Sequence, residues 1–339
     1  PSIIADEMEA DWNKVRVAQA VGDQKYGDQN TDGSRSIRYL YTTMREMGAT
    51  AKAMLLTAAA QTWNLPESEC SAKEHFIHHT SGKKIGFGDL VETVRLLKVP
   101  KNAPLKNPKD FKYIGKNLPS IDAQNYVDGS AVFGLDQRIE NMKFVAIERC
   151  PVTFGTVKSF DKSEALKIAG VEAVIEIPRI KKPFGPLGGI AVIATNTWAA
   201  FKGKEALNIT WDKGENENYD SVQYMNQLVE NVHKKGKVAL EIGSVQKAFK
   251  KAKQTIESTI KLPHIAHTPM EDPNAVAWVQ GDSCEVWAPT QAPQATRKEI
   301  VDYLNTSAAN VKVNVTFLGG GFGRKSKPDY VMEAVVVSK

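Results

Sequence analysis

The sequence lacks the features that mark a membrane-spanning chain or a disulfide-stabilised fold. No apolar run approaches the roughly 18 residues of a membrane-spanning helix, and the longest, such as Ala51–Ala60, fit an amphipathic helix. The sequence holds only three cysteines, Cys70, Cys150 and Cys284, and no C-x-x-C pair. This scarcity argues against a disulfide framework and against an iron–sulfur cluster held within this chain.

A strong charge of one sign is also missing. Over 339 residues, 44 Lys and Arg face 39 Asp and Glu, which gives a net charge of only +5. The one basic cluster, Lys247 to Lys253, has helical spacing and no interleaved aromatics, so we interpret it as a solvated helix face and expect no nucleic-acid partner. The 42% of hydrophobic residues is ordinary for a globular protein, and the length predicts two or three domains.

What the sequence does contain is a strand-like segment that ends in a cluster of glycines. Residues 311–325 are VKVNVTFLGGGFGRK, in which Val311, Val313 and Val315 alternate with polar residues. Each glycine costs about 0.5–1 kcal/mol against alanine in a regular element. Two interpretations stay open: a glycine-rich turn between two elements, or a loop whose N–H groups point at an anionic or oxo-bearing ligand.

Neither common phosphate-binding motif fits this loop. A P-loop, G-x-x-x-x-G-K-[ST], would need a glycine where Arg324 stands. The dinucleotide fingerprint G-x-G-x-x-G fails at the same position. Pro328 moreover predicts that the next helix begins near Pro328–Asp329 and not at the lysine.

The loop instead resembles the GGGFG segment of the molybdenum-binding large subunits of the xanthine dehydrogenase family. Gln291, in WAPTQAP, lies 31 positions before Phe322, a separation that also resembles the family's. The resemblance implies that the Gln291 carboxamide hydrogen-bonds an oxygen on molybdenum. It also implies that Gly320, Gly321, Phe322, Gly323 and Arg324 bind the cofactor, with backbone N–H groups meeting the metal's other oxo group.

Further segments resemble one branch of that family, typified by the beta subunit of isoquinoline 1-oxidoreductase and by aldehyde- and nicotinate-oxidising relatives. Residues 5–15, ADEMEADWNKV, and residues 266–275, AHTPMEDPNA, look like segments of that branch. Residues 32–37, DGSRSI, look like its GGSRS element. The resemblance therefore assigns four more residues to binding of the pterin cofactor: Gly33, Ser34, Arg35 and Ser36.

The resemblance implies an oxidoreductase that hydroxylates N-heterocyclic aromatics or oxidises aldehydes with an oxygen derived from water. The implied cofactor is a molybdopterin dinucleotide with molybdenum, in the cytosine form. The implied partner is a small subunit that carries two [2Fe-2S] clusters, and the implied compartment is the periplasm. Gln291 is the predicted catalytic residue, and no side chain of this chain is predicted to ligate a metal.

One part of the family pattern is missing. The family's glutamate base lies in a segment resembling GVGE, which this sequence does not contain. Members of the branch are about twice as long, so the chain resembles a central fragment that is inactive alone. The alternative hypothesis is a truncated, non-catalytic binding or assembly protein with the same architecture.

The expected fold class is α+β, with an α/β hammerhead domain inserted between parts of a molybdopterin-binding domain. The predicted boundaries are 1–103 for the N-terminal part of the cofactor-binding domain, 104–217 for the hammerhead and 218–339 for the part with the GGGFG loop. Apolar spacing predicts a helix over 35–63, broken at Gly48, and alternation predicts a strand near 255–262.

Several other side chains invite a functional interpretation, and we expect structural roles for them. His75, His78 and His79 fall in a predicted strand, where neighbours face opposite ways and cannot share one metal. His264 and His267 have no third ligand nearby in the sequence, and Cys284 sits in a predicted strand. A turn accounts for the Glu271–Asp272 carboxylates. Arg324 and Lys325 either balance cofactor charge or lie in solvent.

Overall fold

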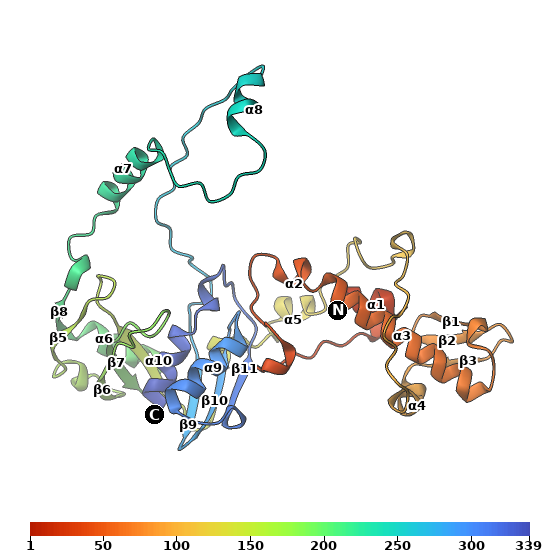
Figure 1. Cartoon of the computed structure of the whole chain (residues 1–339). Coiled ribbons are helices and arrows are strands. Elements are labelled where there is room, and N and C mark those ends of the chain that lie inside the picture. Colours follow the sequence, from red (N-terminus) through yellow and green to blue (C-terminus); the bar gives the residue numbers. More distant parts are fainter. The chain divides into compact units, whose positions relative to one another are not determined.

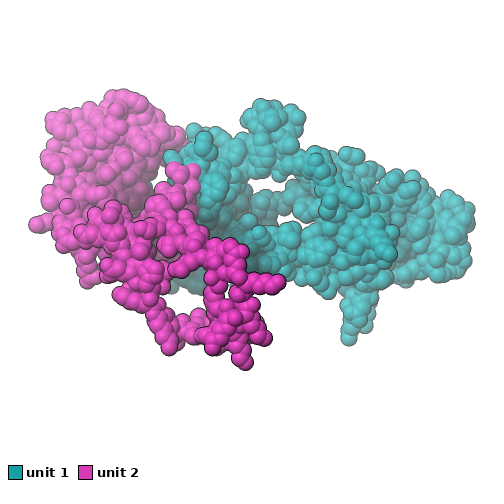
Figure 2. Space-filling model, turned by 90° about the horizontal axis from the view of Figure 1, so that it is seen from above, with its two compact units in different colours: residues 1–138, 269–339 teal, residues 139–268 magenta.

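The chain divides into two compact units, coloured separately in Figure 2. The computed structural model describes all 339 residues. Unit 1 comprises residues 1–138 and 269–339, and unit 2 comprises residues 139–268. Both units combine helices with small sheets, which confirms the predicted α+β class. This division does not test the three predicted domains, which remain a prediction.

The N-terminal part of unit 1 is built on one long helix. Helix α3 (Tyr41–Trp63) follows the short α2 (Arg35–Arg38), so the predicted helix is broken at residues 39–40. The predicted break at Gly48 was wrong. Gly48 is buried inside α3, where a Cβ would lie 2.8 Å from the Glu7 Cβ, so this glycine admits helix α1 (Ser2–Glu7).

A three-stranded antiparallel sheet follows α3. Its strands are β1 (Cys70–Lys73), β2 (Phe76–His79) and β3 (Lys84–Gly86), and the short helix α4 (Val91–Arg95) comes next. Ile77 of β2 is completely buried against α3 residues such as Leu55 and Ala58. Helix α5 (Ala123–Asp128) is the last helix of this part of unit 1.

The C-terminal part of unit 1 carries the glycine loop on a second three-stranded sheet. Strand β10 (Ser283–Ala288) pairs antiparallel with β9 (Val276–Gln280) and parallel with β11 (Val311–Val315). Parallel neighbours need a crossover, which helix α9 (Pro293–Leu304) supplies. The glycines follow β11, and helix α10 (Asp329–Ser338) begins after Pro328, as predicted. The buried core of this part includes Val286, Ile300, Val313, Val331 and Met332.

Unit 2 contains two further sheets and their covering helix. The first sheet has the order β4–β7–β6, with strands Phe144–Glu148, Gly189–Ala194 and Val171–Ile177, all antiparallel. The second pairs β5 (Thr156–Asp161) with β8 (Asn208–Asp212). Helix α6 (Thr197–Glu205) packs on the first sheet through Ala199 and Ala200.

Residues 218–268 of unit 2 form only two helices, α7 (Ser221–Val232) and α8 (Val245–Lys251). Asp220 caps α7 by accepting hydrogen bonds from Val222 N and Gln223 N, as its position predicts. The predicted strand near 255–262 was wrong: no strand forms there, and no residue of 218–268 is buried. A strand needs a neighbour for its backbone groups, and this segment has none in the structure. No helix of the chain has the length and apolar character to cross a membrane.

Candidate functional site

Two glycines of the loop are required by close approach of other residues of the chain. A Cβ on Gly319 would lie 2.5 Å from the Glu271 Cβ, and a Cβ on Gly321 would lie 2.5 Å from Gln291 Oε1. Between them Gly320 has φ +93°, a conformation that side chains disfavour. The run of glycines is therefore explained by the packing of the loop against Glu271 and Gln291.

The loop presents three successive backbone N–H groups that donate to no other group of the chain. These belong to Gly320, Gly321 and Phe322. Gly321 is a buried residue, while the Phe322 ring is 72% exposed and its φ is +51°. Buried N–H groups in proteins nearly always have a partner, so a free one at Gly321 is a position where a ligand atom is expected.

The Gln291 side chain lies directly against this loop. Its Oε1 accepts a hydrogen bond of 3.1 Å from Gly323 N, and its backbone N donates to Lys325 O at 3.0 Å. The carboxamide N carries two hydrogens, of which one is donated to Thr31 O at 2.6 Å. The predicted catalytic residue and the predicted glycine loop thus share one site, and one carboxamide hydrogen stays available for a ligand.

Thr31 brings the N-terminal segment to the same place. Its N donates to Gln291 O at 2.8 Å, while its carbonyl accepts from the Gln291 carboxamide. The predicted cofactor-binding residues 33–36 begin two positions further on. Gly33 and Ser34 have positive φ values of 46° and 58° in an exposed turn.

No hydrogen bond or ion pair joins residues 33–36 to the glycine loop. The Arg35 guanidinium is bound to the Asp28 carboxylate at 2.6 Å. The structure therefore joins this segment to the site through Thr31, a residue that no sequence motif marks.

The two cations after the loop have different environments. Arg324 forms two hydrogen bonds to the Asp329 carboxylate, of 2.8 and 2.7 Å, which raise its pKa further above the ordinary range. Lys325 is 0% exposed, and its ammonium lies 2.8 Å from Glu271 Oε2. Both cations are therefore paired with carboxylates, and Lys325 binds one for which the sequence predicts only a turn.

Glu271 is the centre of a buried hydrogen-bond network. Its Oε2 accepts from Gly319 N at 3.0 Å and from Lys325 Nζ, and its Oε1 accepts from Gly134 N at 2.9 Å. Burial raises the pKa of the Glu271 carboxyl, but the hydrogen bonds from Lys325 and Gly319 outweigh this effect and leave the pKa below its ordinary value. The turn interpretation of Glu271 was therefore incomplete.

The remaining candidates have local structural partners. His75 Nδ1 accepts from Asp11 N at 2.8 Å, and the buried His79 ring contacts Ser81 and Glu69. Burial raises the pKa of the Cys284 thiol to about 11, which leaves it protonated and a poor nucleophile at neutral pH. No three His, Cys, Asp or Glu side chains gather as a metal-binding group.

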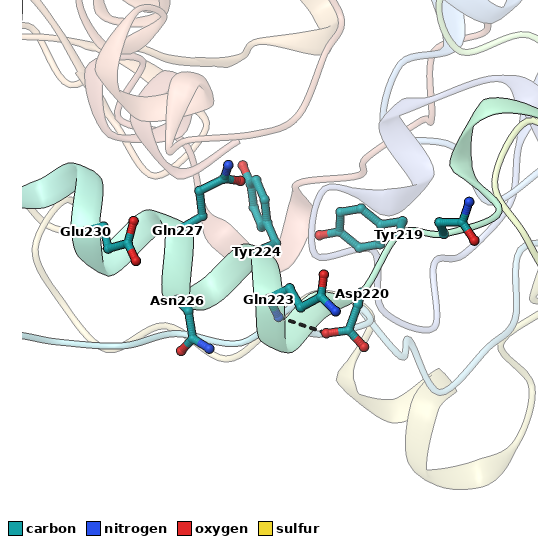
Figure 3. A pocket seen from close by; sticks show the side chains of 8 residues that line it. Tyr219, Asp220, Gln223, Tyr224, Asn226, Gln227 and Glu230 are labelled. Carbon is teal, nitrogen blue, oxygen red and sulfur yellow. Dashed lines mark hydrogen bonds between the residues drawn. The ribbon is translucent and has the colours of Figure 1, made fainter.

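A separate surface hollow lies along α7 in unit 2. It is lined by residues 218–230, among them Tyr219, Asp220 and Tyr224, which Figure 3 shows as sticks. The His264 ring stacks on Tyr224 with a centroid distance of 5.8 Å. The hollow contains none of the residues predicted to bind a cofactor, so it is not the candidate site.

The residues that are present fit a molybdenum–pterin cofactor. Such a group carries oxo and phosphate oxygens, which accept hydrogen bonds. The loop offers the free N–H groups of Gly320, Gly321 and Phe322, and Gln291 offers one carboxamide hydrogen beside them. Side-chain-free backbone at the loop also leaves room for a close approach.

Comparison with known proteins defines the class of this site. The family model of the molybdopterin cofactor-binding domain matches residues 228–338, which include Gln291 and the whole glycine loop. The chain therefore carries a molybdopterin-binding domain.

The chain is also similar to curated proteins along nearly its whole length. The chain is 28% identical to the membrane-bound aldehyde dehydrogenase [pyrroloquinoline-quinone] of Gluconacetobacter polyoxogenes, over 99% of this chain and 44% of that protein. It is 25% identical to the isoquinoline 1-oxidoreductase subunit beta of Brevundimonas diminuta, over 98% of this chain and 48% of that protein. These matches agree with the resemblance to the molybdenum-binding subunits of the xanthine dehydrogenase family on which the sequence predictions rest. The chain spans about half the length of these two relatives.

A solved structure overlaps with part of the chain. The quinoline 2-oxidoreductase of Pseudomonas putida 86 covers 66% of this chain, with 34% of its own chain, at 16% identity and a TM-score of 0.48.

Proposed function

We propose that this chain is the molybdopterin-binding part of an oxidoreductase that hydroxylates N-heterocyclic aromatics or oxidises aldehydes. The observation that carries the proposal is the hydrogen bond between Gly323 N and Gln291 Oε1, which joins the carboxamide to a loop with three free N–H groups. The names of the relatives, an aldehyde dehydrogenase and an isoquinoline oxidoreductase, supply the two substrate classes.

In this proposal the residues of the chain bind and orient, and they do not exchange protons. When bound, the molybdenum cofactor supplies a two-electron oxidation in which the added oxygen comes from water. The Gln291 carboxamide donates one hydrogen bond toward the cofactor without changing its own charge. Its other N–H hydrogen is donated to Thr31 O, and its oxygen accepts from Gly323 N. The orientation of the carboxamide is therefore set before any ligand arrives. The loop N–H groups provide partial positive charge without a mobile side chain.

Metal analysis of the full-length natural gene product tests the proposal. The protein should be made in a host that synthesises the pterin cofactor, purified, and analysed for molybdenum by mass spectrometry. The proposal expects molybdenum near one equivalent per chain, together with oxidation of an aldehyde or an N-heterocycle. Absence of molybdenum in correctly folded protein would favour the alternative, a non-catalytic binding or assembly protein.

A quinone is the competing cofactor, because the name of the Gluconacetobacter relative includes pyrroloquinoline quinone. Molybdenum is favoured here because the molybdopterin-binding domain covers the glycine loop and Gln291. The same preparation discriminates the two: acid release should yield a pterin fluorophore, whereas a quinone would be detected by its own absorbance and mass.

We also propose the cytosine dinucleotide form of the cofactor and a partner subunit with two [2Fe-2S] clusters. Both follow from the family resemblance, and the scarcity of cysteine in this chain supports a separate location for the clusters. Hydrolysis of the released cofactor should give CMP and not GMP. A co-purified small subunit should carry four iron atoms, and its absence would contradict the partner proposal.

The periplasm is the proposed compartment, again from the resemblance alone. Cell fractionation with a cytoplasmic and a periplasmic marker enzyme tests it. Recovery with the cytoplasmic marker would contradict this proposal and leave the chemistry unaffected.

A further inference from the structure

Both ends of the glycine loop are tied to a single carboxylate oxygen. Oε2 of Glu271 accepts from Gly319 N, at the start of the loop, at 3.0 Å. The same oxygen lies 2.8 Å from the ammonium of Lys325, just after the loop ends. Glu271 also donates its backbone N to Gly319 O at 2.9 Å. The free N–H groups of residues 320–322 lie between these two points of attachment.

Lys325 also reaches the other half of the site through its backbone. Its carbonyl accepts from Gln291 N at 3.0 Å and from Thr290 Oγ1 at 3.3 Å. One residue therefore connects Glu271, through its side chain, with the strand end that carries Gln291. A shift of Lys325 would move the loop and the carboxamide relative to each other.

The ion pair is a costly way to fill this space. Lys325 is 0% exposed and Glu271 only 6% exposed. Removing two charges from water costs more than their attraction commonly returns, and apolar residues of similar volume often replace such a pair without loss of stability. The Glu271–Lys325 pair is thus poorly explained by stability alone, while its contacts with both ends of the loop are specific.

We propose that Glu271 and Lys325 are positioning residues that close the ends of the glycine loop and hold its free N–H groups in register with the Gln291 carboxamide. This inference rests on the proposed function, because the alignment of these donors matters only if they bind the cofactor together. Both side chains are buried against partners within the chain, so their effect passes through the loop and through Gln291.

The test replaces the pair by neutral groups of similar size in the full-length protein. The double variant Glu271→Gln/Lys325→Met removes both charges and leaves no unpaired buried charge. The matched control is Asp6→Asn/Lys106→Met, which neutralises a second buried pair of unit 1 with an Nζ–Oδ1 distance of 2.7 Å. Glu9, which also pairs with Lys106, keeps its ion pair with Lys112 in this control. Amide hydrogen exchange and molybdenum content are measured for both variants and for the wild type.

The inference expects exchange to rise about tenfold in peptides that cover residues 318–325 of the loop variant, with β9 and β10 peptides unchanged. Molybdenum per chain should fall below about half of the wild-type value, as expected when pre-organised donors are lost. The control should retain wild-type exchange in the loop and wild-type molybdenum.

Two results would overturn the inference. One is unchanged loop exchange with full molybdenum in the loop variant. The other is a rise in exchange spread evenly over β9, β10 and the loop, which would show a general structural role. Absence of molybdenum from the wild type would instead refute the proposed function. The exchange contrast between the two double variants would then decide alone whether the pair holds the loop.

Discussion

Residues 269–339 and residues 218–268 adjoin in the chain and both contain alternating apolar residues, but they fold very differently. In the first segment the alternation becomes β9, β10 and β11, whose inward residues are buried in β10 and β11 and half-buried in β9. In the second, Ile256 is 86% and Ile260 80% exposed, and no strand forms. Alternation therefore produces a strand only where a neighbouring strand and a covering helix are available.

The difference also explains where the candidate site lies. The loop after β11 has a partner on each side, the buried Glu271 and the half-buried Gln291, so its conformation is defined by tertiary contacts. The helix α7 in residues 218–268 is instead defined by a local signal, the Asp220 cap. A site that must hold several donors in fixed positions needs the first kind of support.

The largest expected effect comes from removing one charge of the buried pair. Lys325→Met leaves the Glu271 carboxylate buried without its cation, and we expect a loss of about 3–5 kcal/mol in the free energy of unfolding. Urea denaturation of the variant and the wild type measures it. A loss close to zero would show that Lys325 does not compensate the buried charge of Glu271. The buried contacts of residues 269–339 would then not distinguish that segment from residues 218–268.

A pair of matched isoleucine truncations tests the comparison itself. Ile300 of α9 is completely buried, so Ile300→Ala should cost about 2–5 kcal/mol, whereas Ile260→Ala should change stability by no more than about 0.5 kcal/mol. Both values come from denaturant midpoints under one set of conditions. Equal losses at the two positions would show that residue 260 is packed in solution.

Loss of the predicted catalytic carboxamide should affect function far more than stability. Gln291→Ala removes two hydrogen bonds, to the exposed Thr31 and the half-buried Gly323, which water can replace, so the cost should be about 1 kcal/mol. Turnover of an aldehyde or N-heterocycle should be lost. Unchanged turnover per molybdenum would contradict the assigned role, and Gln291→Glu serves as the control of equal size.

The smallest expected effect is a pH dependence that originates at Glu271. Its folded pKa lies below the ordinary 4.5, so the stabilisation by the carboxylate is complete above that value and is lost as the pH falls through the folded pKa. The stability difference between wild type and Glu271→Gln should therefore shrink as the pH falls below about 4.5. A difference that stays constant or grows on acidification would contradict the lowered pKa.

Much of the site could be predicted from the sequence, because its main residues are close to informative patterns. The glycine run and the Gln291 segment carry a family resemblance that implies that these parts meet, and Gly323 N and Gln291 Oε1 do. Pro328 likewise predicted the start of α10.

The supporting contacts could not be predicted in the same way. Glu271 and Lys325 are 54 positions apart, and Arg324 and Lys325 are indistinguishable as neighbouring cations until the fold buries one of them. A carboxylate beside Pro273 resembles a turn residue unless its distant donors are known. The break predicted at Gly48 failed for a related reason: that glycine serves the approach of α1 and not a change of backbone direction.

The most direct test of the central claim is the molybdenum content of a Gly321→Ala variant. Its added Cβ would lie 2.5 Å from Gln291 Oε1 and must push the carboxamide and the loop apart. Gly236→Ala is the control, because a Cβ on Gly236 would meet no heavy atom within 4 Å and its φ is not positive. We predict wild-type molybdenum in the control and less than about a tenth of it in Gly321→Ala, since pre-organised donors are lost. Equal molybdenum in the two variants would contradict a cofactor site formed jointly by Gln291 and the glycine loop.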